Sequence, residues 1–156
     1  MKIQGRIISG PKETIVAIPR DDGDIIFKLR AVLTFDEFDV LCPEPVAPTR
    51  VYKDGRKELD IENADYVKLS GERASKRWDW MILKSLSATE GLEWETVDMA
   101  KPDTYTNYLK ELNGAGFTTY EIQKIIQGVI DANGLDETKY KEARERFMYS
   151  QVPSQP

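Results

Sequence analysis

Histidine is absent from this chain of 156 residues. Its absence removes the side chain that most often serves as a general base, activates a nucleophile or binds a metal. Cysteine occurs once, at Cys42, so the chain offers neither an internal disulfide nor a pair of thiolates at metal-ligand spacing. The Walker phosphate loop, the Gly-x-Gly-x-x-Gly fingerprint and the Gly-x-Ser-x-Gly elbow are also missing. We therefore expect no catalytic residue, no metal site and no cofactor.

Long apolar runs are missing as well. No stretch approaches the ~20 apolar residues that a membrane-spanning helix needs, and the first residues lack the apolar segment of a signal peptide. The 22 basic and 27 acidic side chains give a formal net charge of −5, without the basic cluster that binds a phosphate backbone. These features predict a cytosolic protein that binds neither membranes nor nucleic acid.

Residues 1–42 have the pattern of a β-rich lobe, within a chain that we expect to be α+β. Turn residues separate three candidate strands, which lie over 2–8, 14–18 and 25–33. The third alternates apolar residues such as Phe27 and Leu29 with Lys28 and Arg30, as a sheet with one wet face requires. The simplest arrangement is a three-stranded antiparallel β-meander.

A short helix over 35–41 is expected to cover this sheet with Phe38 and Leu41. Thr34 and Glu37 have the spacing of a capping box at its start. Residues 43–62 then form a Pro-rich connector, with three prolines between positions 43 and 48 that favour extended backbone. A Lys-Asp-Gly-Arg turn within it indicates either a small hairpin or an ordered loop.

Residues 63–149 show helical periodicity and predict an α-helical lobe of about four helices. Their expected starts lie near Asn63, Pro102, Thr118 and Asp136. The best local signal is a capping box of Thr118 with Glu121, flanked by Phe117 and Ile122 at the spacing of a hydrophobic staple. Residues 150–156 are expected to form a disordered tail.

The central helix of this lobe carries Trp78 and Trp80, which point in nearly opposite directions at about 100° per residue. At least one should therefore mark an interface, either with a partner or with the β-rich lobe. Asp79 lies on the apolar arc of the same helix. It is either a desolvated carboxylate with a raised pKa or, more simply, the ion-pair partner of Arg73 or Lys76.

Large aromatic and aliphatic side chains are the candidate partner-binding residues, because such side chains dominate interface hot spots. Helical periodicity selects Trp80, Leu83, Trp94, Tyr105 and Tyr108. The alternative interpretation is that each of them packs in the protein's own core. A homo-oligomer is compatible with either interpretation.

Three segments carry a resemblance to a known family. Residues 77–86 run Arg-Trp-Asp-Trp-Met-Ile-Leu-Lys-Ser-Leu, residues 91–98 run Gly-Leu-Glu-Trp-Glu-Thr-Val-Asp, and Ala115-Gly116-Phe117 opens the Ile-rich helix that ends at 133–135. With these segments the chain resembles the small tail assembly chaperones of long-tailed bacteriophages (siphophage type) over roughly residues 66–149. The resemblance extends loosely to 35–38 and 42–45.

The resemblance implies a non-enzymatic viral protein of the host cytoplasm. Such a protein binds the tape-measure protein, keeps it soluble and helps tail-tube subunits polymerise around it. A frameshifted longer form of the chain itself would be a further partner. The alternative hypothesis is a structural subunit of the virion, such as a tail or head-tail joining protein, whose aromatic residues pack against identical neighbours.

Overall fold

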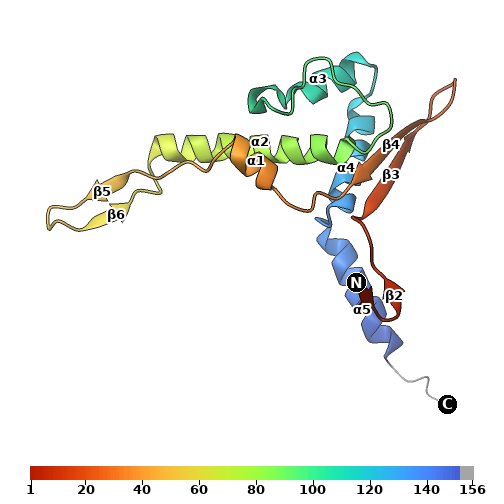
Figure 1. Cartoon of the computed structure of the whole chain (residues 1–156), viewed down its shortest axis with the longest axis horizontal. Coiled ribbons are helices and arrows are strands. Elements are labelled where there is room, and N and C mark those ends of the chain that lie inside the picture. The colour runs from red at the N-terminus through yellow and green to blue at the C-terminus, as the bar shows by residue number, and fades with distance from the viewer. Residues whose placement is uncertain (152–156) are drawn as a thin grey trace.

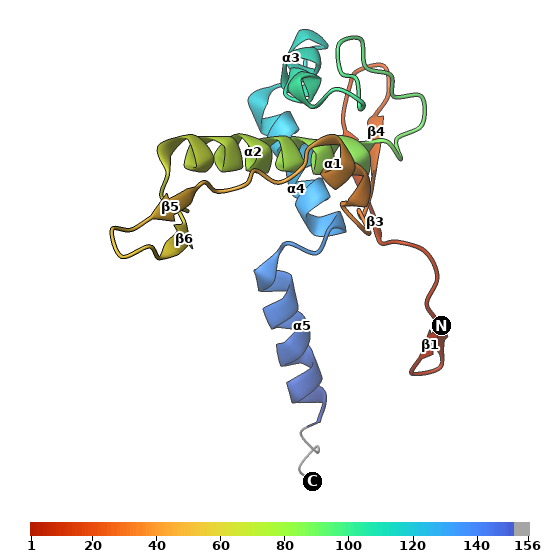
Figure 2. The ribbon, with the colours of Figure 1, turned by 60° about the vertical axis from the view of Figure 1, so that its left-hand side comes forward.

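The computed structural model describes residues 1–151 and has an α+β fold (Figure 1). Its body consists of β3 (Glu13–Ile18), β4 (Ile25–Arg30), α1 (Asp36–Leu41), α2 (Ala64–Leu86), the 3₁₀ turn η1 (Pro102–Thr104), α3 (Asn107–Gly114) and α4 (Thr119–Ala132). The elements that project from the body are β1 (Lys2–Ile3) with β2 (Arg6–Ile7), β5 (Thr49–Val51) with β6 (Lys57–Leu59), and α5 (Glu137–Ser150). The outline is therefore a body with arms, which Figure 2 shows from another side.

The strands of the described residues form three separate antiparallel hairpins, so the expected three-stranded meander is wrong. Residues 2–7 fold back on themselves because Gln4 and Gly5 both adopt positive φ, at 51° and 76°. Two consecutive residues with positive φ make the tight turn of a two-residue hairpin. Residues 2–3 and 6–7 therefore pair with each other, and the first strand of the expected meander is not available to pair with β3. Of the two arrangements expected in the Pro-rich connector, a hairpin or an ordered loop, the structure has the hairpin, formed by β5 and β6.

The β3–β4 hairpin packs against helices on one side. Val16 pairs with Phe27 and Thr14 with Leu29 in its register, and Phe27 and Leu29 are buried. Helix α4 crosses β3 and β4 at Gly128, which lies directly on Leu29 and Val16. The alternation seen in the sequence therefore marks the buried face of this hairpin.

One hydrophobic core joins the N-terminal and C-terminal halves of the chain. Trp80 of α2 lies between Phe35 and Phe38, with ring centroids 5.5 and 5.9 Å away. This contact confirms that a tryptophan of the central helix marks an interface with the N-terminal segment. Trp78, on the opposite side of α2, is exposed.

Helix α1 differs from its prediction in its cap and in one of its two apolar contacts. The helix begins at Asp36 with Phe35 as N-cap and no capping side chain, so the capping box expected at Thr34 is wrong. Phe38 is buried as expected, whereas Leu41 is exposed. Stacking of the Arg77 guanidinium 3.6 Å from the Phe35 ring centroid helps to hold this segment on α2.

Local signals place the later helices more accurately. Asn63 caps α2 by accepting hydrogen bonds from the backbone N–H groups of Asp65 and Tyr66. The capping box of Thr118 and Glu121 is present in both directions. Pro102 starts only a 3₁₀ turn, and the α-helix expected there begins at Asn107.

Asn133 connects three parts of the body. Its Oδ1 accepts a hydrogen bond from the Val32 backbone N–H at 2.8 Å, and its Nδ2 donates to Ser85 Oγ at 2.9 Å and to the Val129 carbonyl at 2.8 Å. The side chain thus ties the segment after β4 to α2 and α4. Gly134 follows in the left-handed conformation, with φ of 67°, just after the end of α4.

Helix α5 begins at its predicted cap, Asp136, and contains no buried residue. It runs to Ser150, so the start of the expected tail is helical, and residues 152–156 lie outside the described residues. None of the helices within residues 1–151 is long and apolar enough to cross a bilayer.

Candidate protein-binding groove

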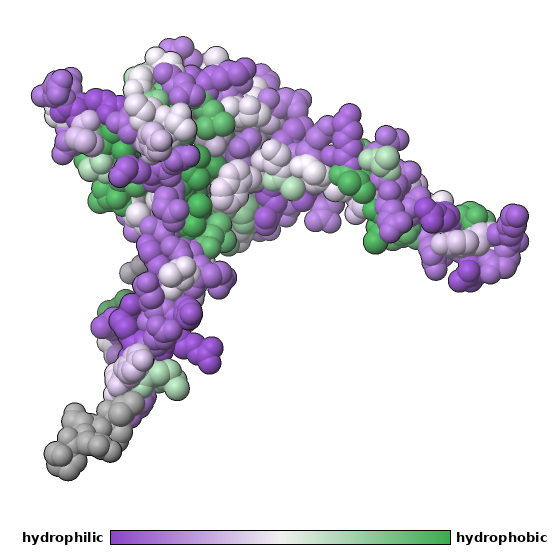
Figure 3. Space-filling view, turned by 180° about the vertical axis from the view of Figure 1, so that it is seen from behind, coloured by the Kyte–Doolittle hydropathy of each residue, from purple (hydrophilic) through white to green (hydrophobic). Residues whose placement is uncertain are grey.

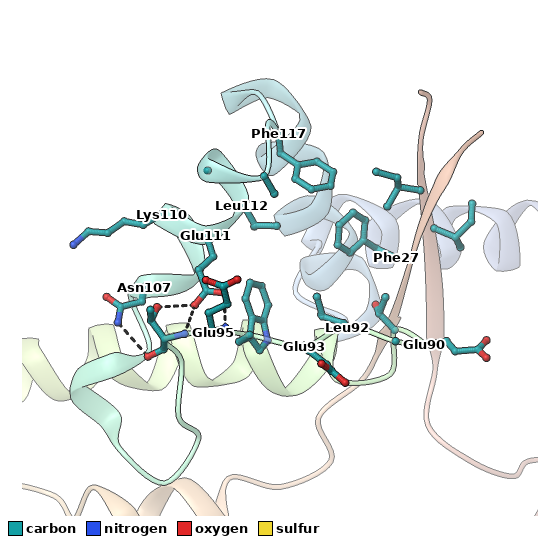
Figure 4. A pocket seen from close by; sticks show the side chains of 18 residues that line it. Phe27, Glu90, Leu92, Glu93, Glu95, Asn107, Lys110, Glu111, Leu112 and Phe117 are labelled. Atoms are coloured by element: carbon teal, nitrogen blue, oxygen red, sulfur yellow. Dashed lines mark hydrogen bonds between the residues drawn. The ribbon is translucent and has the colours of Figure 1, made fainter. Parts of the chain in front are cut away.

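A groove of about 1050 Å³ lies between the tip of the β3–β4 hairpin, the segment that follows α2, and α3 (Figure 4). Its apolar floor is formed by Ile25, Ile26, Phe27, Leu92, Trp94, Leu112 and Phe117. Its rim carries Glu90, Glu93 and Glu95. In Figure 4 the apolar side chains gather around one space, while Glu90 and Glu93 point outward. The site is therefore an apolar surface with an acidic border.

The wall formed by residues 89–96 is fixed by hydrogen bonds. Thr89 Oγ1 accepts from the Lys28 backbone N–H at 3.0 Å and donates to the Lys28 carbonyl at 3.1 Å, which attaches the wall to the edge of β4. Glu111 of α3 accepts from the backbone N–H groups of Glu95 and Thr96 at 2.9 and 2.7 Å. Both ends of the segment are thus held by neighbouring elements.

Glu111 acts here as an anionic hydrogen-bond acceptor. Burial alone would raise the pKa of its carboxyl, but hydrogen bonds from the Thr96 hydroxyl and the nearby backbone N–H groups outweigh burial and lower the pKa below its ordinary value. The Thr96 Oγ donates to Glu111 Oε1 at 2.6 Å. At neutral pH the carboxylate is therefore charged and holds the wall against α3.

The end of the groove near α4 is held by Arg20. Its guanidinium bonds Glu121 at 2.6 and 3.1 Å and lies 5.0 Å from the Phe117 ring centroid. The ion pair with Arg20, together with the Thr118 backbone N–H, lowers the pKa of Glu121 to about 2. Phe117 in turn meets Phe27 edge to face at 5.4 Å between centroids. These contacts fix two aromatic rings of the floor.

The rim is available for charge pairing. Glu90, Glu93 and Glu95 are exposed, and none of the ion pairs within residues 1–151 involves them. Lys110 is the basic residue among those that line the groove. An apolar ligand with flanking positive charges is therefore the chemistry that this site fits.

Of the five candidate contact residues selected from the sequence, Trp94 lines the groove. The other four are core residues: Trp80 and Leu83 are 1% exposed, Tyr105 is 0% exposed and Tyr108 is 2% exposed. The second half of α2 packs against β4, α4 and η1, so its apolar arc is covered from several sides. The surface of this fold does not offer these four side chains to a partner.

Asp79 is buried, and the expected ion pair with Arg73 or Lys76 is wrong. Arg73 pairs with Asp39 at 2.6 Å, and Lys76 pairs with Asp103 at 2.7 Å. Burial raises the pKa of the Asp79 carboxyl. Burial, and then the charge of Asp79, raises the pKa of Tyr108 to about 12. The described residues contain no group of three or more side chains that could hold a metal ion.

Further exposed aliphatic side chains lie on the arm formed by the connector, the β5–β6 hairpin and the start of α2. They are Val46, Val51, Leu59, Ile61, Val67 and Leu69. Figure 3 shows apolar patches interspersed with hydrophilic ones along this arm.

Sequence reasoning missed the groove because its residues come from three distant segments. A local signal was nevertheless present at 92–95, where Leu92 and Trp94 alternate with Glu93 and Glu95. Such alternation places apolar side chains on one side of an extended segment and charges on the other. Comparisons with protein-family models, curated proteins and solved structures find no match for this chain.

Proposed function

We propose that this protein is a non-enzymatic assembly chaperone of a long-tailed bacteriophage. In this proposal it acts in the host cytoplasm, binds a helical segment of the tape-measure protein and assists polymerisation of the tail tube around it. The observation that carries the proposal is the groove with an apolar floor and an acidic rim. The resemblance of residues 66–149 to tail assembly chaperones supplies the biological setting.

The groove fits one mode of protein recognition. An amphipathic helix can place residues at positions i, i+3, i+4 and i+7 onto an apolar floor. Without such a cover, the apolar face of the helix promotes aggregation. The half-buried Trp94 and the exposed Ile25 and Ile26 offer apolar area for such a contact. Glu90, Glu93 and Glu95 would pair with Lys or Arg residues that flank the apolar stripe. The bound segment is therefore expected to be basic and amphipathic.

Co-expression with the tape-measure protein tests this function. We expect the tape-measure protein to stay soluble and to co-purify with the chain, and Glu93→Lys to weaken the complex because it reverses a rim charge. Glu62→Lys is the matched control, since Glu62 is an exposed acid in the connector, away from the groove. A tape-measure protein that is equally soluble without this chain and never co-purifies would refute the proposal.

The exposed apolar arm supports a second candidate function. Its six exposed aliphatic side chains fit packing against identical neighbours, as expected of a structural subunit of the tail or the head-tail joint. Mass spectrometry of purified particles separates the two functions. Stoichiometric presence of the chain in the virion favours the structural subunit, and its absence favours the chaperone.

A further inference from the structure

Helix α5 has one apolar face with basic borders. At about 100° per residue, Tyr140, Ala143 and Phe147 share a face, and Arg144 lies beside them. The opposite face carries Glu142, Glu145 and Tyr149. The acidic side chains of this helix thus point mostly away from its apolar stripe, whereas a basic one adjoins it.

This apolar face is uncovered in the monomer. Tyr140 and Phe147 are each 58% exposed, and the helix has no buried residue. Its contacts with the preceding residues include the Lys139–Asp131 ion pair at 2.8 Å and the Tyr140 hydroxyl, which lies over Gly134. An isolated helix of 14 residues is marginally stable in water, so α5 gains from any surface that covers it.

We propose that α5 of a second copy of this chain docks in the groove. In this contact Ala143 and Phe147 lie on the apolar floor, and Arg144 faces the rim formed by Glu90, Glu93 and Glu95. The two surfaces match in polarity, because one is apolar with an acidic border and the other is apolar with a basic border. The spacing of Tyr140, Ala143 and Phe147 is that of a helix bound in a groove.

The position of the groove requires that the helix come from another copy. Ala115 and Phe117 line the groove just before α4, and α5 follows the opposite end of α4. Helix α4 has 14 residues, which is about 21 Å of helix. Figures 1 and 2 show α5 pointing further away from the groove, and the Lys139–Asp131 ion pair holds it in that direction.

This inference goes beyond the proposed function, since it shares the groove but needs no tape-measure protein. The contact joins two different surfaces of the chain and is therefore heterologous. Two copies can close it by exchanging their α5 helices, and larger assemblies can form if the exchange is not reciprocal.

Sedimentation equilibrium of the full chain tests the proposal, with two aromatic variants as a matched pair. We expect the wild-type chain to associate, and Phe147→Ala to weaken association by roughly ten- to a hundredfold because it removes a buried aromatic side chain. Tyr149→Ala should leave association unchanged within about twofold, since Tyr149 lies on the opposite face. Both residues are exposed in the monomer, so neither variant should alter folding.

Charge reversal tests the pairing in trans. Glu93→Lys and Arg144→Glu should each weaken self-association when the variant chain is alone. In an equimolar mixture the groove of each variant meets a compatible helix of the other, so association should return. High salt should weaken the wild-type contact as well, because exposed charges are screened.

Three association results would overturn the proposal: a chain that is monomeric at every concentration, equal effects of Phe147→Ala and Tyr149→Ala, or no recovery of association in the mixture. A Phe147 side chain that is shielded from solvent equally at all protein concentrations would also overturn it, because that result would place α5 in its own groove. The two proposals fail separately. A monomer that binds the tape-measure protein refutes only the self-association, and a self-associating chain that never binds it refutes only the proposed function.

Discussion

Helix α4 lies close against the β3–β4 hairpin at Gly128, in the interior of the helix. A Cβ atom added there would overlap Leu29 Cδ1 and would lie 2.6 Å from Val16 Cγ2. Leu29 is 0% exposed, so its side chain has no room to withdraw. Gly128→Ala should therefore separate α4 from the β3–β4 hairpin or force both side chains out of their preferred rotamers.

Two opposing effects set the size of this change. Alanine is favoured over glycine in a helix interior by about 0.5–1 kcal/mol, whereas overpacking a filled core costs about 1–3 kcal/mol. Gly71→Ala isolates the first effect, because Gly71 lies in the exposed part of α2 and an added Cβ would meet nothing within 4 Å. The difference in unfolding free energy between the two variants should be about 1–3 kcal/mol, with Gly128→Ala the less stable.

Urea unfolding followed by tryptophan fluorescence measures this difference, and thermal unfolding checks it. For a chain of this size each kcal/mol corresponds to roughly 2–4 °C in the unfolding midpoint. Gly71→Ala should be more stable than the wild type. If both variants gain the same stability, α4 does not lie on the hairpin as closely as described, and the reasoning is refuted.

Three further predictions concern polar groups. Glu121 has a pKa of about 2 against an ordinary 4.5, so its pair with Arg20 stabilises the fold above pH 4.5 and loses this effect as pH falls toward 2. Glu121→Gln should flatten the pH dependence of urea unfolding in that window. Asn133→Ala leaves the Val32 N–H without its acceptor and should lower the free energy of unfolding in urea by about 1–3 kcal/mol. An unchanged free energy of unfolding would contradict this prediction. The pKa of Asp79 is raised above 3.8, so wild-type stability falls as pH rises past that value, and Asp79→Asn should stabilise the fold at pH 7 but not below pH 3.8.

Signals that depend on neighbouring residues predicted the fold well. The caps at Asn63, Thr118 and Asp136 lie where the sequence placed them, because a capping side chain bonds backbone N–H groups two or three residues away. Pairing between distant segments was harder to predict. The expected meander failed because the turn at Gln4 and Gly5 competes with pairing to β3.

The candidate site was predicted less well for the same reason. Periodicity placed Trp80 and Tyr108 on apolar helix faces, but it does not tell whether such a face contacts a partner or the protein's own core. The groove depends on Thr89 bonding β4 and on Glu111 bonding the wall, and both contacts join segments that are far apart in the sequence. Trp94 was selected from the sequence, whereas its acidic neighbours were not.

Helix α2 is continuous over 23 residues, yet its residues are buried only from Asp79 onward. Its first turns are therefore protected from water chiefly by their own backbone hydrogen bonds and by the cap at Asn63. Amide protons there should exchange with solvent through local fraying, while those after Asp79 should exchange only when the whole domain opens. The β5–β6 hairpin directly precedes the exposed, fraying start of α2. The orientation of the hairpin can therefore fluctuate while the hydrophobic core stays folded.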